Sequence, residues 1–128
     1  MDDVSVLKFK FDIIRKPKKT TVNIFQYAAS FKILTNDLTY LDIPDLCIID
    51  FAYQLSQYDY NESIYHIIPI DSEDKILSLY NIGDIIKIDS MWTEEIIYVN
   101  KNQLKEEIVR LINDIEIIIG RKIDFFLK

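Results

Sequence analysis

The chain has 128 residues, a length that suits one domain with a single hydrophobic core, so we expect residues 1–128 to fold as one unit. Hydrophobic residues make up 49% and charged residues 28% of the sequence, which excludes a disordered chain and a coiled coil. The net charge is −6, and residues 36–95 hold thirteen acidic and only two basic residues, which argues against nucleic acid as the main ligand because phosphates need a basic face.

The N-terminal part of the sequence predicts strands. The stretch VSVLKFKFDII alternates apolar and polar residues from Leu7 to Ile13, as a strand with one solvated face does. RKPKKT reads as a turn, residues 21–34 as a long second strand, TND as another turn and residues 38–43 as a short strand. The basic turn from Arg15 to Lys19 suits either a soluble hairpin tip or a patch for an anionic ligand.

A helix is expected over residues 44–58, because Pro44 suits a first turn and apolar residues then recur at helical spacing. Asp42 or Asp45 would lie near its positive N-terminal end. The helix has an ordinary core stripe that includes Ile48 and Leu55. The opposite stripe is less polar than a solvated helix needs, so we expect another layer or a partner to cover it. It consists of Leu46, Asp50, Tyr53 and Gln57.

The C-terminal part predicts an antiparallel meander followed by a helix. Strands are expected at 63–70, 75–82, 85–92 and 96–99, with turns at DSED and at Gly83-Asp84. The last helix should run over 103–119, with Asn100 or Asn102 as its cap and Gly120 as its end. These elements predict an α+β fold: a single antiparallel sheet of about six strands with two helices packed on one face.

Cys47 and His66 are the candidates for nucleophilic chemistry. Acidic and apolar neighbours around Cys47 oppose a thiolate, so a packed cysteine and a hydrogen-bonded histidine are the better interpretation. A lone cysteine cannot form an intrachain disulfide, and MDDVSV lacks the positive charge of a signal peptide. No apolar run reaches the roughly 18–20 residues of a membrane span, so we expect a cytoplasmic protein.

Metal and hydrolytic sites receive little support from the pattern. The DSED turn lacks the glycine and the closing glutamate of a calcium loop, which favours a solvated turn. Asp84 and Asp89 are an odd number of residues apart and would face opposite sides of a strand. No nucleotide, zinc or nucleophile-elbow motif is present. We therefore expect no enzyme, catalytic residue, metal or cofactor.

The acidic middle of the chain is the remaining candidate site. In a meander, the DSED turn and the segment after Trp92 fall at the same end of the sheet, with Lys75 the only cation nearby. We expect the following residues to gather there and face a basic protein: Asp71, Glu73, Asp74, Trp92, Glu94 and Glu95, with Tyr60 as a further aromatic contact. A second-choice surface consists of Asp50, Tyr53, Asp59 and Glu62. Against both stands the plain alternative that acids collect in loops because loops are wet.

An acidic α+β chain with DIPDLCIIDFAYQL leading into a helix, a meander ending in SMW and an amphipathic last helix resembles small bacterial immunity proteins. These proteins neutralise the toxin domains of polymorphic or contact-dependent toxin systems. The resemblance implies a stoichiometric inhibitor of a basic toxin domain, often a nuclease, whose active site acidic side chains would block. It assigns no role to any single residue.

The sequence therefore leaves three functions open. The first is a non-enzymatic inhibitor that binds a basic protein. The second is a small enzyme or ligand-binding domain with a pocket between sheet and helices, and the third is a structural subunit that pairs through the stripe of Leu46 and Tyr53. The sequence leaves the oligomeric state open.

Overall fold

A computed structural model describes residues 4–16, 27–69, 74–120, 122 and 123. The predicted α+β class is confirmed, with two helices and seven strands in the described part of the chain. The elements follow in the order β1 (Leu7–Arg15), β2 (Ala28–Thr35), β3 (Leu38–Leu46), α1 (Ile48–Ser56), β4 (Ile64–Ile67), β5 (Leu77–Ile82), β6 (Ile85–Ser90), β7 (Thr93–Asn100) and α2 (Lys101–Ile119). Neither of these helices is long and apolar enough to cross a membrane.

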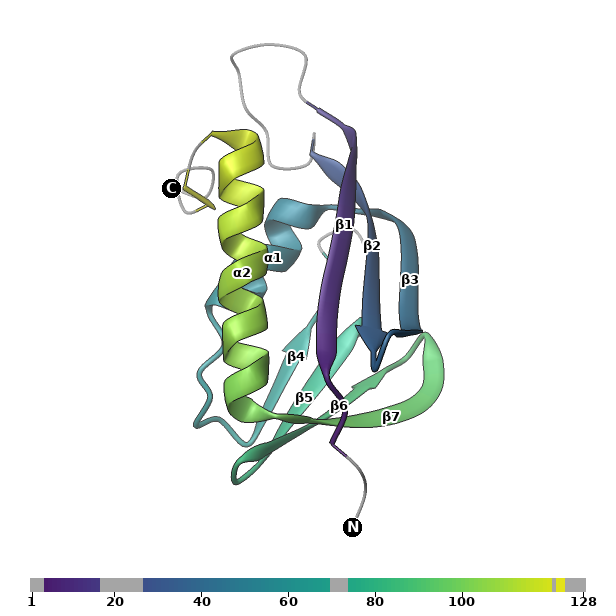
Figure 1. Cartoon of the computed structure of the whole chain (residues 1–128), viewed down its shortest axis with the longest axis vertical. Helices are drawn as coiled ribbons and strands as arrows, with labels where there is room; N and C mark the ends of the chain where they lie inside the picture. Colours follow the sequence, from purple (N-terminus) through teal and green to yellow (C-terminus); the bar gives the residue numbers. More distant parts are fainter. Residues whose placement is uncertain (1–3, 17–26, 70–73, 121, 124–128) are drawn as a thin grey trace.

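The strands form two antiparallel sheets, so the prediction of a single six-stranded sheet was wrong. One sheet has the order β1-β2-β3 and the other the order β4-β5-β6-β7. In Figure 1 the three-stranded sheet runs alongside α2, and the four-stranded sheet crosses below it at a steep angle. The alternation of residues predicts where strands lie but not which strands pair, and α1 separates the two meanders in the chain.

The start of α1 also differs from the prediction, because Pro44 lies in β3 and the helix begins at Ile48. Proline is tolerated there since β3 is an edge strand, where a missing N–H leaves no ladder bond unmade. Asp42 and Asp45 therefore lie in β3 and do not act at the N-terminus of α1. Asp42 is opposite Lys32 of β2, and Asp45 accepts two hydrogen bonds from the guanidinium of Arg15 at 2.8 and 2.9 Å.

The TND and Gly83-Asp84 turns and the cap residues of α2 were predicted correctly, although α2 begins at Lys101 rather than at residue 103. The predicted RKPKKT and DSED turns lie mostly outside the described residues. Asn36 and Asp37 both have positive φ in the two-residue turn between β2 and β3, and Gly83 has φ 65° in the turn between β5 and β6. The Asn100 side chain caps α2 by accepting from the backbone N–H groups of Asn102 and Gln103, and Gly120 ends the helix in the left-handed conformation.

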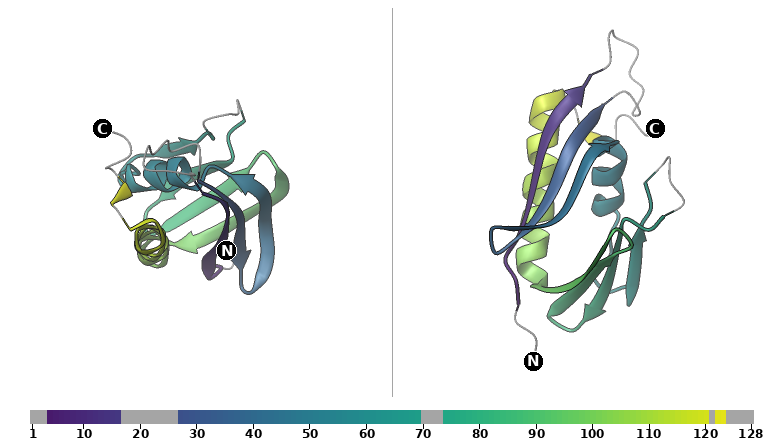
Figure 2. Two further views of the ribbon diagram at one scale, coloured as in Figure 1. Left: turned by 90° about the horizontal axis from the view of Figure 1, so that it is seen from above. Right: turned by 90° about the vertical axis from the view of Figure 1, so that its right-hand side faces the viewer.

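Both sheets and both helices share one hydrophobic core. Phe31 of β2 is at its centre, with its ring 5.7 Å from that of Phe9 and 4.7 Å from that of Phe51 in α1. Figure 2 shows α1 and α2 on the same side of the three-stranded sheet, so the helix part of the prediction holds for that sheet. Two further contacts join the sheets: Ser5 bridges Val99 of β7, and the Tyr40 hydroxyl of β3 donates to the Glu95 carbonyl.

Candidate protein-binding site

One end of the four-stranded sheet carries exposed aromatic, thioether and carboxylate groups together. The residues of this acidic end are Asp74, Met91, Trp92, Glu94 and Glu95, all exposed. They meet there because the β6–β7 turn comes back beside the segment that leads into β5, where the Met91 N–H donates to the Lys75 carbonyl. The indole N–H of Trp92 donates to the Asp74 carboxylate at 3.4 Å. Trp92 thus has an orientation set by its neighbour while 43% of it remains exposed.

The acidic end is attached firmly to the other sheet through Tyr40. Its hydroxyl donates to the Glu95 carbonyl at 3.0 Å, and its ring is buried. Burial, together with the nearby charges of Asp89 and Glu95, raises the pKa of Tyr40 above its ordinary value, so the hydroxyl remains a donor. Within the described part of the chain, neither Glu94 nor Glu95 forms an ion pair, so both carboxylates face solvent without an internal counter-ion.

Not every residue of the predicted site lies at this end. Asp71 and Glu73 fall outside the described residues. Tyr60 lies at the opposite end of the sheet, where its carbonyl accepts from the Asn81 side chain and the Lys105 ammonium lies 4.9 Å from its ring centre. It therefore does not join the acidic end. The meander leaves Tyr60 there because the chain enters β4 from that side.

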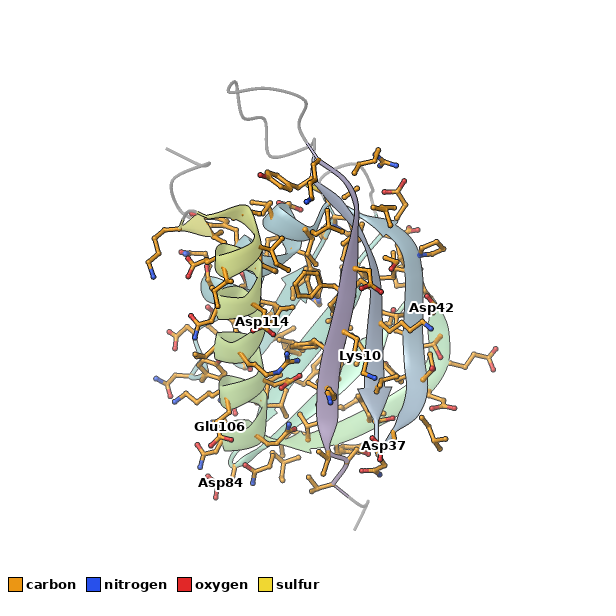
Figure 3. The ribbon with its side chains drawn as sticks, turned by 45° about the horizontal axis from the view of Figure 1, so that its top comes forward. Lys10, Asp37, Asp42, Asp84, Glu106 and Asp114 are labelled. Carbon is orange, nitrogen blue, oxygen red and sulfur yellow. The ribbon has the colours of Figure 1, made fainter. Side chains whose placement is uncertain are left out.

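Only two of the four residues of the second-choice surface are fully exposed. Asp50 is buried, and its carboxylate accepts from the Gln54 amide at 3.0 Å. Leu46 is buried in β3 and Tyr53 is half-buried against the core, so both apolar members of the stripe are packed within the protein, which was one of the two expected outcomes. Gln57 is exposed. Asp59 and Glu62 are exposed. Figure 3 shows Asp84, another acid at this end of the sheet, near Glu106 of α2.

Cys47 and His66 hold ordinary structural positions. Cys47 precedes α1 at the N-cap and makes no side-chain cap hydrogen bond. His66 is exposed on β4, and its Nδ1 lies 2.8 Å from the Ser78 hydroxyl. The predicted hydrogen-bonded histidine is confirmed. Cys47 is half-buried rather than fully buried.

The alternative of an enzyme needs a pocket lined by residues that could carry chemistry, such as Cys47 or His66. One cavity of about 500 Å³ lies at the C-terminal end of α2 beside Ile117 and Gly120, and two of about 490 and 250 Å³ follow the junction of β1 with α2. Neither Cys47 nor His66 lines any of the three. Within the described ranges, no three His, Cys, Asp or Glu residues come together as metal ligands would.

The junction of α2 with β1 contains polar residues that the sequence analysis did not single out. Gln103 both donates to and accepts from the backbone of Leu7, at 2.7 and 2.9 Å. One turn later Glu107 accepts the Phe9 N–H at 2.7 Å, and Arg110 donates to the Phe9 carbonyl at 2.6 Å. These side chains pair with the strand edge that faces away from β2. The spacing of Gln103, Glu107 and Arg110, four and three residues apart, places them on one face of α2 beside its core stripe, and this spacing was the signal in the sequence that could have indicated the junction.

Glu107 and Arg110 form a partly buried ion pair within this junction. Burial alone would raise the pKa of Glu107, but hydrogen bonds from Arg110 and the Phe9 N–H, with the Arg110 charge, outweigh it and lower that pKa below 4.5. The hydrogen bond to Glu107 in turn raises the pKa of Arg110. Arg110 also donates to Asp114 at 2.7 Å. The pair therefore fastens a helix to a strand, and its groups are all engaged within the protein.

The fold and its exposed groups define an α+β protein of two antiparallel sheets, with the acidic end as its most distinctive surface. By sequence the chain belongs to a family described as a domain of unknown function, DUF7878, whose model matches residues 6–120. No curated protein and no solved structure matches the chain. The family match covers both sheets and both helices, so the acidic end and the α2–β1 junction lie within the family domain.

Proposed function

We propose that this protein is a non-enzymatic inhibitor that binds a basic protein through the acidic end, as the immunity protein of a bacterial toxin system would. The observation that carries the proposal is the exposed Trp92, oriented by Asp74 and followed by two carboxylates that form no ion pair with any described residue. Tryptophan is among the residues that contribute most to binding when a partner covers them.

The charges and the aromatic group would act at different stages of binding. Glu94 and Glu95 would attract a lysine- or arginine-rich surface over a distance of about one Debye length, roughly 8–10 Å at physiological salt, and so speed the encounter. Trp92 and Met91 would then be covered by the partner and slow its dissociation. A toxin nuclease is a fitting target because its active site must attract phosphate.

The experiment begins with the partner. The tagged protein is used to capture proteins from cells of its native organism, and each captured protein is expressed alone and together with this chain. We expect one captured protein to be basic, toxic when expressed alone and harmless when co-expressed. Captured proteins that are neither basic nor toxic would contradict the proposal.

Variants then test the site. We expect Trp92→Ala to weaken binding by about 30-fold or more, mainly through faster dissociation. Glu94→Lys with Glu95→Lys should slow association by about tenfold at low salt and much less at high salt. Asp84→Lys, the reversal of an exposed acid at the opposite end of the sheet, changes the net charge as much as Glu94→Lys alone does and is the matched control for that single variant. If Asp84→Lys slows association as much as Glu94→Lys does, only the net charge matters and the acidic end is not the contact.

A further inference from the structure

The outer face of the four-stranded sheet, which points away from the core, is mostly apolar, and none of the described helices or strands covers it. The strand registers place its side chains in cross-strand rows, one of which runs from Ile64 through Tyr80 and Lys87 to Tyr98. Ile64, Ile82 and Ile96 on this face are 49, 54 and 51% exposed. We call these six residues the outer face: Ile64, Tyr80, Ile82, Lys87, Ile96 and Tyr98.

Single exposed isoleucines are ordinary, but contiguous ones are not. Four strands at about 4.8 Å spacing, with about six residues each at roughly 3.3 Å, give a face of roughly 15 by 20 Å. The apolar side chains occupy part of this face of roughly 300 Å², which is about the size of the largest apolar patch on a typical monomer, and such patches are often functional. The row from Ile64 to Tyr98 crosses all four strands, with Lys87 as its charged member.

The three-stranded sheet shows that an apolar outer face is not a general feature of this protein. Its solvent side carries Lys10 opposite Lys32 and Lys32 opposite Asp42, and Figure 3 shows Lys10 and Asp42 on neighbouring parts of that sheet. Such a charged face is solvated and needs no partner. The row of Lys10, Lys32 and Asp42 is therefore charged throughout, whereas the row from Ile64 to Tyr98 has Lys87 as its one charged member.

The charges on the outer face identify what covers it. Among the described residues of the row from Ile64 to Tyr98 and the adjacent row from His66 through Ser78 to Asp89, the formal charges are those of Lys87 and Asp89. They cancel, although the whole chain has a net charge of −6. The face therefore does not attract a strongly charged partner. Two copies can therefore meet across these two rows without net repulsion between the rows.

From this pattern we infer that the outer face binds the same face of a second copy of this chain. A two-fold axis that runs across the strands at the level of Ile88 brings Lys87 of one copy opposite Asp89 of the other, twice in each dimer. Ile64 and Ile82 lie on the apolar surface that such a contact covers. Asp74, Met91 and Trp92 of the acidic end lie outside the strands, in the segment before β5 and in the β6–β7 turn, so the contact between the strand rows does not include them.

The dimer is reversible. Its area lies below the roughly 800 Å² per partner of a standard complex, and we expect a dissociation constant of about 1–100 µM. The inference does not depend on the proposed function, because it concerns a different surface. Failure of one therefore leaves the other standing.

The test is sedimentation velocity of the full chain over about 1–500 µM, a range that brackets the expected constant. We expect a monomer at the low end and a dimer at the high end. Lys87→Asp and Asp89→Lys should each weaken the dimer by about tenfold, because each sets like charges opposite one another. The double exchange, Lys87→Asp with Asp89→Lys, should restore it, since the opposite charges then meet again in reversed positions.

Controls separate this contact from other forms of association. Lys10→Asp makes the same charge change on the outer side of the three-stranded sheet and should leave the dimer unchanged. Ile82→Glu should abolish it, with thermal melting used to confirm that each variant is folded. A chain that stays monomeric over the whole range overturns the inference. So does a folded double exchange that is as weak as the single variants, because the two-fold arrangement requires its recovery.

Discussion

The two helices close two sheet edges with different chemistry. At the α2–β1 junction, Gln103, Glu107 and Arg110 together satisfy both backbone groups of Leu7 and Phe9. At the α1–β4 junction, Gln54 alone bonds both backbone groups of Ile68, at 2.8 and 3.1 Å. The rest of the second junction is aromatic, with the Tyr58 ring 4.6 Å from Tyr60 and 5.1 Å from Tyr65. A glutamine amide thus closes a strand edge in both places, and an ion pair strengthens only one.

This difference gives the two junctions opposite responses to pH. The charged junction depends on a carboxylate whose pKa is lowered in the folded protein. The aromatic junction depends on phenols whose pKa values are raised, chiefly by burial. Acid should therefore weaken the α2–β1 junction first, and alkali the α1–β4 junction. Variants at each junction test this contrast, and the largest effect is expected at the α2–β1 junction.

Glu107→Ala should destabilise the protein by about 3 kcal/mol, because it leaves the Phe9 N–H without its acceptor and Arg110 without its main partner. Urea unfolding measures the change. Glu106→Ala is the matched control: it removes an exposed glutamate from the same turn of α2 and should change stability by less than about 0.5 kcal/mol. Equal effects of the two would mean that helix propensity rather than the junction is being measured.

The same variant tests the acid limb of the pH dependence. Since folding lowers the pKa of Glu107, its contribution is present above the unfolded value of 4.5 and is lost as the pH falls through the folded value. The free energy of unfolding of the wild type should therefore fall more steeply below pH 4.5 than that of Glu107→Gln. Parallel curves for the two would show that other carboxylates cause the acid limb.

Gln54→Ala and Gln103→Ala compare the two junctions directly. Each removes two hydrogen bonds to backbone, those of Ile68 just after β4 and those of Leu7 in β1, and each should cost about 1–2 kcal/mol. Gln54→Ala also removes the amide that donates to the buried Asp50 carboxylate. Gln57→Ala, an exposed glutamine just after α1, is the control. We expect Gln103→Ala to be the milder of the two, because Glu107 and Arg110 still hold β1, whereas no other described side chain bonds the backbone of Ile68. A reversed order would show that the ion pair adds little.

These junctions also show what the sequence could and could not predict. The strands, the cap at Asn100 and the turns at Asn36 and Gly83 follow from local rules that act within a few residues. The pairing of Phe9 with Glu107 joins residues 98 apart, and no periodicity indicates it. The division of the strands into two sheets likewise depends on contacts between residues far apart in the sequence.

The acidic end shows the same limit. The meander predicted that Asp74, Trp92, Glu94 and Glu95 would share one end, because hairpins fix which strand ends meet. It did not predict that Tyr60 would lie at the other end. Nor did it predict that Asp50 would be buried with its carboxylate bonded to Gln54. The burial of Asp50 depends on where β4 lies relative to α1, which is again a matter of long-range packing.

Tyr58→Phe should leave the protein as stable as the wild type or up to about 1 kcal/mol more stable at neutral pH, because the buried Tyr58 hydroxyl has no hydrogen-bond partner among the described residues. Burial, with smaller effects from Tyr60, Glu62 and Asp59, raises its pKa to about 12. The wild type should lose stability as the pH rises from the unfolded value of 10.0 toward 12, and the variant less so. A clear loss at neutral pH would show that the hydroxyl does bond in solution.

Cys47→Ser should have the smallest effect, a gain of about 0.5 kcal/mol. Cys47 occupies the N-cap of α1 without a side-chain cap bond, whereas Asn100 accepts two N–H groups at the start of α2. A serine hydroxyl is a good N-cap acceptor, and the substitution alters few atoms. Asn100→Ala, which should cost about 1 kcal/mol, calibrates what a cap contributes in this protein. Thermal unfolding in a reducing buffer measures both. If Cys47→Ser instead destabilises the protein by more than Asn100→Ala does, the thiol contributes through its packing between β3 and α1, and the start of α1 is held by that packing rather than by capping.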